Sequence, residues 1–179
     1  MATAQMSISP EDLSQIPHGS ERIPEAGILV IFGASGDLTK RKLLPALFHL
    51  EQAGLLPENF AIVGVARRPL GDEFAADMRA GIIEFGGVDA GETKLDDFAK
   101  KISYFPLRFD VLDDYAGLKV ELDRIAKEKG IGGVRLFYLA TAPEYFAPII
   151  ENLGAQGMAQ PEQGRAAVVI EKPFGHDLV

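Results

Sequence analysis

Short apolar runs and longer amphipathic segments alternate along the chain from residue 27 onward. Four of the five runs consist of consecutive apolar residues, which predicts strands that are covered on both faces, as in a parallel sheet. The fifth run, Ile102–Phe109, is more mixed and contains Pro106, which indicates an edge strand. The predicted strands are Ile28–Phe32, Phe60–Ala66, Ile102–Phe109, Val134–Ala140 and Ala167–Glu171.

The segments between these runs carry apolar side chains at i, i+3 and i+4, the spacing of amphipathic helices. The predicted helices are Leu38–Ala53, Asp72–Phe85, Asp114–Lys129 and Pro143–Asn152, and residues 86–93 and 154–165 are predicted as loops. A regular alternation of strand and helix predicts right-handed βαβ units. The expected fold is therefore α/β, a doubly wound parallel sheet with helices on both faces and strand order 3-2-1-4-5.

Pro45 lies inside the first predicted helix. Proline has no backbone N–H, so it cannot donate to the carbonyl four residues earlier, and it costs roughly 3 kcal/mol in a straight helix. We expect this helix to kink near Arg41 or to begin again close to Pro45.

The composition excludes several classes of function. Among the 179 residues, 18 Lys and Arg face 26 Asp and Glu, a net charge of −8, so a nucleic-acid partner is not expected. The absence of cysteine excludes disulfides, thiolate nucleophiles and cysteine-based metal sites. Because the three histidines, His18, His49 and His176, are far apart in the sequence, no metal site is predicted.

The first 26 residues contain Pro10, Pro17 and Pro24 and no apolar run that could serve as a secretory signal. We expect residues 1–26 to form a flexible arm and residues 27–179 to form one domain. No stretch approaches the ~20 apolar residues that are needed to cross a bilayer. A cytoplasmic protein without a membrane partner is expected.

The junction after the first strand, FGASGDLTK, has the composition of a phosphate-binding turn. Its small residues let backbone N–H groups and a helix N-terminus approach a pyrophosphate closely. The segment departs from the G-x-G-x-x-G pattern, because Ser35 and Leu38 stand at the second and third glycine positions. The alternative is an ordinary strand-to-helix turn that needs a glycine with positive φ.

The junction after the second strand, VGVARRPL, places Arg67 and Arg68 where an NAD site usually has an acidic residue. An arginine can stack on adenine and bind the 2′-phosphate with its fork of donors, which favours NADP. The alternative is a pair of solvated loop arginines.

The segment VVIEKPFGHDLV ends the last predicted strand with Glu171 and Lys172. The carboxyl ends of buried parallel strands face the ligand crevice in doubly wound folds, so both residues are candidates for the site. The alternative for Lys172 is a solvated strand end.

Taken together, GASGDLTKRKLLPALFHL, VGVAR, FYLATAP and VIEKPFGHDL resemble the N-terminal coenzyme domain of glucose-6-phosphate dehydrogenases, from about residue 28 to residue 178. The resemblance implies a Rossmann-like fold in a cytoplasmic oxidoreductase of the pentose phosphate pathway. Members of this family oxidise the C1 hydroxyl of glucose 6-phosphate to the 6-phosphoglucono-lactone and transfer the hydride to NADP. Some members also use NAD.

The resemblance also implies roles for particular residues. Arg67 would hold the adenosine 2′-phosphate, Asp110 and Val111 would lie near the coenzyme, and Tyr138 would line the nicotinamide side. Lys172 would touch both substrate and coenzyme. His176 stands where the family often has arginine. The phosphate-binding turn would consist of Gly33, Ala34, Ser35, Gly36, Asp37, Leu38, Thr39 and Lys40.

The general base of the family is a histidine in a segment resembling RIDHYLGKE, which these 179 residues do not contain. No catalytic residue is therefore predicted in this chain. Two hypotheses remain. The chain is the coenzyme domain of a longer, homo-oligomeric dehydrogenase and is monomeric by itself, or it is a freestanding NADP-binding module or sensor without catalysis.

We predict that the 179 residues alone show no measurable oxidation of glucose 6-phosphate. General-base assistance contributes ~10²–10⁴-fold, and substrate positioning contributes further. The measurement is NADPH absorbance with purified chain, glucose 6-phosphate and NADP. Robust turnover would contradict the prediction and direct the search for a base to Asp110, Glu144 and His176.

Overall fold

The computed structural model describes residues 23–171 except 90, 92 and 161–163. Five parallel strands form one sheet with the order β3-β2-β1-β4-β5, as predicted. The strands are β1 (Gly27–Phe32), β2 (Ala61–Ala66), β3 (Ile102–Pro106), β4 (Val134–Leu139) and β5 (Ala166–Ile170).

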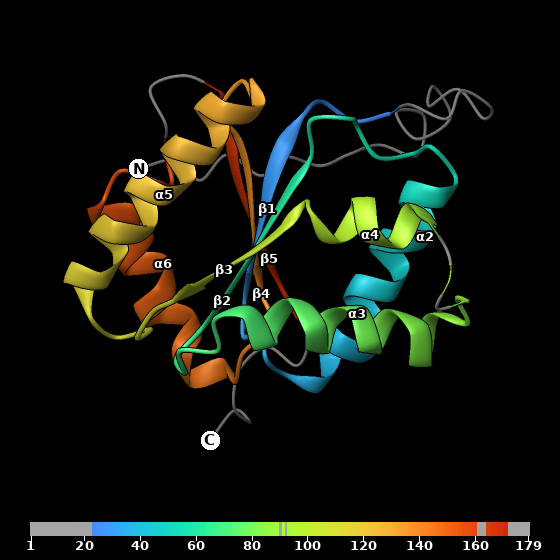
Figure 1. Cartoon of the computed structure of the whole chain (residues 1–179). Helices are drawn as coiled ribbons and strands as arrows, with labels where there is room; N and C mark the ends of the chain where they lie inside the picture. The colour runs from blue at the N-terminus through green and yellow to red at the C-terminus, as the bar shows by residue number, and fades with distance from the viewer. Residues whose placement is uncertain (1–22, 90, 92, 161–163, 172–179) are drawn as a thin grey trace, which may run out of the picture.

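Helices cover both faces of the sheet. Helices α5 and α6 lie on one side, and α2, α3 and α4 lie on the other (Figure 1). The helical segments are η1 (Thr39–Leu43), α2 (Leu44–Gln52), α3 (Asp72–Gly86), α4 (Thr93–Ala99), α5 (Leu112–Lys129), η2 (Pro143–Tyr145) and α6 (Phe146–Ala155). This arrangement confirms the predicted doubly wound α/β fold.

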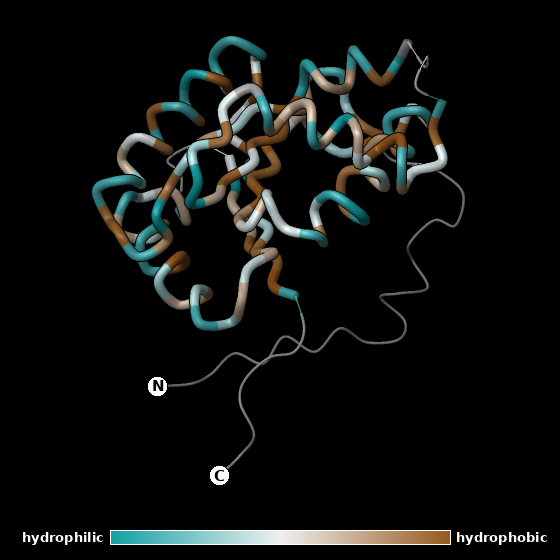
Figure 2. Tube along the Cα trace, turned by 60° about the horizontal axis from the view of Figure 1, so that its bottom comes forward, coloured by the Kyte–Doolittle hydropathy of each residue, from teal (hydrophilic) through white to brown (hydrophobic). Residues whose placement is uncertain are grey.

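The core divides along the two faces of β1. Val30 and Phe32 point into an apolar cluster with α5 and α6, whereas Leu29 and Ile31 point into a second cluster with α2, α3 and α4. Apolar residues accordingly concentrate along the central strands in Figure 2, and hydrophilic residues on the outer turns of the helices. Strands β1 and β2 are buried at every position, so the prediction of two covered faces is confirmed for them.

The same prediction is wrong for β5 and in part for β4. Val168 and Val169 of β5 are 39% and 37% exposed, and β4 alternates between buried and half-buried residues. The reason is positional, because β5 lies at the edge of the sheet and α2, α3 and α4 pack over the opposite end, on β1, β2 and β3. A continuous run of apolar residues therefore did not reveal which faces of a strand are covered by helices.

The break at Pro45 is confirmed. The segment η1 is π-helical, and α2 begins at Leu44, with Pro45 in its first turn. Pro45 donates no backbone hydrogen bond, so the regular α-helical hydrogen bonding is interrupted at this residue. The chain forms a π-helical turn before α2 begins.

Some boundaries differ from the predicted ones, and one helix was not predicted. Strand β3 ends at Pro106 and not at Phe109, and α5 begins two residues early, at Leu112. The prediction contained no counterpart of α4, which is short and is held by the burial of Leu95 and Phe98, one turn apart. Tertiary burial explains this helix, because so short a segment is unstable as an isolated helix.

No helix within the described part of the chain is long and apolar enough to span a membrane.

Gly64 in β2 allows α3 to pack directly against the sheet. A Cβ atom at this position would lie 2.4 Å from the ring of Phe74, a residue that is only 2% exposed. We predict that Gly64→Ala lowers the free energy of unfolding by about 1–3 kcal/mol through overpacking, measured by urea denaturation.

Gly132→Ala is the matched control, because a Cβ atom there meets nothing within 4 Å and its φ is not positive. An equal loss of stability in both variants would contradict the overpacking argument.

Candidate functional site

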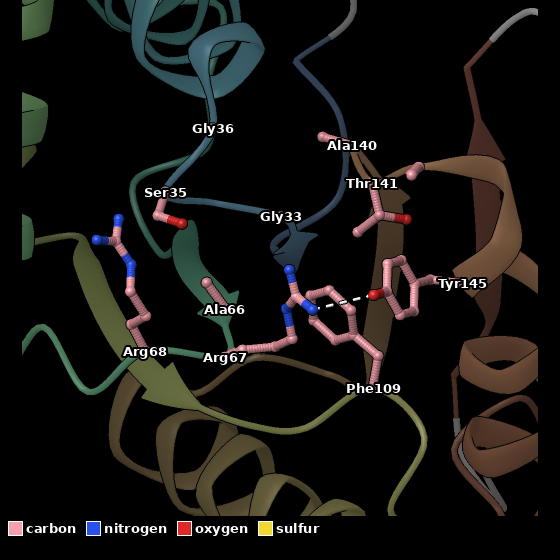
Figure 3. A pocket seen from close by; sticks show the side chains of 11 residues that line it. Gly33, Ser35, Gly36, Ala66, Arg67, Arg68, Phe109, Ala140, Thr141 and Tyr145 are labelled. Carbon is pink, nitrogen blue, oxygen red and sulfur yellow. Dashed lines mark hydrogen bonds between the residues drawn. The ribbon is translucent and has the colours of Figure 1, made fainter.

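A cleft of about 450 Å³ lies at the carboxyl ends of β1, β2 and β4, where the strand order reverses. In open α/β sheets this switch point is where ligands bind. The cleft is lined by Gly33, Ser35, Gly36, Ala66, Arg67, Arg68, Phe109, Ala140, Thr141, Ala142 and Tyr145 (Figure 3).

The turn after β1 passes between the ends of β2 and β4, and at Gly33 it leaves no room for a side chain. Gly33 has φ +82°, and a Cβ atom on it would lie 2.2 Å from the carbonyl oxygen of Ala140. The N–H groups of Gly33 and Ala34 both donate to the carbonyl of Val65, at 2.9 and 3.1 Å. Glycine is therefore required at position 33 on two grounds, its positive φ and the close approach of the backbone.

Residues Gly33–Lys40 of the predicted phosphate-binding turn do not all reach the cleft. Gly33, Ser35 and Gly36 line it, and helical structure starts directly afterwards, at Asp37. Ala34 and Thr39 are fully buried, whereas Asp37 and Leu38 are exposed. Lys40 packs against α3, where a Cβ atom on Gly81 would lie 2.6 Å from its Cγ atom.

Arg67 lies on two aromatic rings inside the cleft. Its Nη1 atom donates to the hydroxyl of Tyr145 at 2.9 Å, and its Cζ atom lies 5.1 Å from the centre of the Tyr145 ring. The same Cζ atom is 5.9 Å from the ring centre of Phe109. The two rings meet edge to face with their centres 5.3 Å apart, so they form one platform under the guanidinium (Figure 3).

Arg68 points away from Tyr145, on the Ser35 side of the cleft (Figure 3). Its backbone is held by Tyr104, whose hydroxyl donates to the carbonyl of Arg68 and, at 3.3 Å, to that of Ala66. Burial raises the pKa of Tyr104, and the nearby charge of Arg68 partly opposes this rise. The structure thus brings both predicted arginines to the cleft, with different surroundings.

The loop after β3 carries Phe109 into the cleft. The carbonyl of Phe109 accepts hydrogen bonds from the Tyr115 hydroxyl at 2.8 Å and from Nδ2 of Asn152 at 3.2 Å. Asp110 and Val111, which the family resemblance placed near the coenzyme, follow directly but do not line the cleft. Phe109 was missed because its run of apolar residues was assigned to a strand.

Tyr138 and Glu171 meet at the ends of β4 and β5. The Tyr138 hydroxyl donates to Oε1 of Glu171, and burial, together with this negative neighbour, raises the pKa of Tyr138 to about 12. Neither residue lines the cleft. Lys172 and His176 lie outside the described residues, so their predicted contacts stay predictions. No cluster of possible metal ligands occurs among the residues that the structure describes.

The sheet order, the glycine turn and the cleft at the switch point define a dinucleotide-binding domain of the Rossmann class. The chain belongs to the glucose-6-phosphate dehydrogenase family, because residues 30–179 match the family model described as "Glucose-6-phosphate dehydrogenase, NAD binding domain".

Curated relatives agree with this assignment. Glucose-6-phosphate 1-dehydrogenase of Chlamydia pneumoniae is 45% identical over 156 residues, and that of Bacillus subtilis is 42% identical over 153 residues. Each alignment covers 84% of this chain and 30% of the relative. The chain thus spans about 30% of the length of the relatives that it matches.

Solved structures agree as well. A glucose-6-phosphate dehydrogenase in complex with its substrate glucose-6-phosphate superimposes with a TM-score of 0.75 at 35% identity, covering 87% of this chain and 32% of that one. The enzyme from Mycobacterium avium gives a TM-score of 0.71 at 32% identity over 86% of this chain and 31% of that one.

The stability that the loop around Phe109 contributes to the fold should decrease in acid. Asp114 accepts from Nε of Arg108 at 2.9 Å, from Nη2 at 2.7 Å and from the backbone N–H at 3.0 Å, and these bonds lower its pKa from 3.8 to about 2. A lowered pKa stabilises the fold above the ordinary value, and this contribution is lost as the pH falls from about 4 to about 2. We predict that Asp114→Asn is less stable than the wild type at pH 7 and loses less further stability below pH 4.

Urea denaturation at pH 7, 4 and 3 measures this difference. Asp113→Asn is the matched control, since it removes the same charge from the first turn of α5, and Asp113 acts on Arg108 through its charge and not through the hydrogen bonds that Asp114 accepts. Parallel profiles of unfolding free energy against pH for wild type and Asp114→Asn would contradict the conclusion that Asp114 causes this loss of stability.

Proposed function

We propose that this chain is the NADP-binding part of a glucose-6-phosphate dehydrogenase. The complete enzyme would oxidise glucose 6-phosphate at C1 and transfer the hydride to NADP, with coenzyme binding as the contribution of these residues. The family assignment supports this proposal, and so does the relative whose solved structure is in complex with glucose-6-phosphate.

The observation that carries the choice of coenzyme is the charge of the cleft. Arg67 and Arg68 line it at the end of β2, and the 11 lining residues include no carboxylate. An NAD site usually needs an acidic residue at this place to hold the ribose hydroxyls, whereas an NADP site needs a cation for the 2′-phosphate. The described part of the cleft therefore fits NADP better than NAD.

The glycine turn fits a pyrophosphate beside these arginines. Gly33 and Gly36 line the cleft and have no side chain that could shield it. The N–H groups of Gly33 and Ala34 donate to Val65, and that of Gly36 donates to Gly33, so an anion would be bound by the N–H groups that follow at the start of the helix. The helix that begins at Asp37 directs its N-terminus to the same place, which favours an anion.

The two ends of the coenzyme would then lie on opposite sides of the turn. Arg67 would hold the adenosine 2′-phosphate on the β2 side, and Tyr138 would face the nicotinamide on the β4 side. We further propose, from the family resemblance, that Asp110 and Val111 approach the coenzyme and that Lys172 contacts both coenzyme and substrate.

A titration of the chain with NADP and with NAD tests the proposal, and NADP should bind more tightly. Charge-assisted hydrogen bonds contribute about 1.5–3 kcal/mol, so Arg67→Ala should reduce the preference for NADP about 10- to 100-fold and leave NAD binding nearly unchanged. Arg124→Ala is the matched control, because Arg124 pairs with Glu121 and Glu128 on α5, outside the cleft. Equal losses for both coenzymes in Arg67→Ala would point to adenine stacking alone.

A further inference from the structure

Arg67 differs from most arginines of the described chain in the partner that holds it. Ion pairs with carboxylates are formed by Arg41, Arg79, Arg108, Arg124, Arg135 and Arg165. Within the described residues, Arg67 forms no such pair, and its guanidinium is held by the neutral hydroxyl of Tyr145 and by two aromatic rings. A neutral partner fixes the orientation of the guanidinium without cancelling its charge.

The contact joins distant parts of the chain across the cleft. Arg67 follows β2 and Tyr145 ends η2, 78 positions later, and β1 lies between β2 and β4 in the sheet. Tyr145 is half-buried and its ring packs edge to face on Phe109 against the core, so the ring is anchored, whereas Arg67 is exposed.

An exposed arginine at a strand end loses considerable side-chain entropy when it is fixed on a ligand. A guanidinium already fixed in the unliganded protein avoids part of this loss. It has five N–H donors in a planar fork, and the Tyr145 hydroxyl uses one of them, on Nη1. The remaining donors stay available for a bidentate contact with a phosphate.

We propose that Tyr145 is a positioning residue for Arg67 and thereby determines the preference for a coenzyme that carries a 2′-phosphate. This inference rests on the proposed function, because it assumes that the cleft binds NADP. The Tyr145 hydroxyl is the group that orients Arg67, since the ring of Phe109 already supplies apolar contact on its own.

The test is Tyr145→Phe, which keeps the ring and removes only the hydroxyl. The dissociation constants of NADP and NAD are measured by calorimetry for wild type, Tyr145→Phe, Arg67→Ala and the double variant. Loss of one positioning hydrogen bond should weaken NADP about threefold to tenfold and leave NAD unchanged. In the Arg67→Ala background, removal of the hydroxyl should have no further effect, because the residue that it positions is absent.

Ser103→Ala is the control, because it removes a side-chain hydroxyl that donates to the Ile62 carbonyl, and neither of these residues lines the cleft. Its preference for NADP should equal that of the wild type. Urea denaturation of each variant separates a loss of folding from a loss of binding.

The outcomes distinguish this inference from the proposed function. If the wild type binds neither coenzyme, the proposed function fails and this inference fails with it. If the wild type prefers NADP but Tyr145→Phe keeps that preference, weakens both coenzymes equally or matches Ser103→Ala, only the role of Tyr145 is overturned. A persistent effect of Tyr145→Phe in the Arg67→Ala background would overturn it as well.

Discussion

The close approach of the Gly33 backbone to the carbonyl of Ala140 constrains the whole binding edge of the sheet. Strand β1 pairs with β2 on one side and with β4 on the other, so the chain that leaves β1 must pass through the gap between their ends. The Val65 carbonyl holds this turn from the β2 side, and Ala140 limits it from the β4 side. The walls of the cleft that β2 and β4 supply therefore meet at Gly33, a position that no side chain could occupy.

A continuous set of contacts connects the core to the charged part of the cleft. The hydroxyl of the buried Tyr115 holds the Phe109 carbonyl, the Phe109 ring meets Tyr145 edge to face, and both rings support the Arg67 guanidinium. In a chain of net charge −8, this arrangement keeps a positive charge oriented at one place on the sheet edge. The orientation of the Arg67 guanidinium thus derives from aromatic side chains packed on the core and not from an ion pair.

The two ends of the sheet show how much depends on coverage by helices. Strands β1 and β2 carry helices on both faces and are fully buried, whereas β5, an equally apolar run, has Val168 and Val169 more than one-third exposed. Hydrophobicity along a strand depends on the local sequence. Burial depends on elements that are distant in the sequence, and the pattern of apolar residues alone does not show where they pack.

The sequence by itself determined the break at Pro45, the glycine turn and the pair of arginines after β2, because each follows from patterns within a few residues. It determined the strand order through the regular alternation of strands and helices along the chain. It also carried the family resemblance through GASGDL and EKPFG. Only the tertiary structure decided that Phe109 and Tyr145 join Arg67, that Tyr138 pairs with Glu171 and that α4 forms. These features depend on contacts between segments far apart in the chain, such as the 78 positions between Arg67 and Tyr145, and no local pattern encodes such a distance.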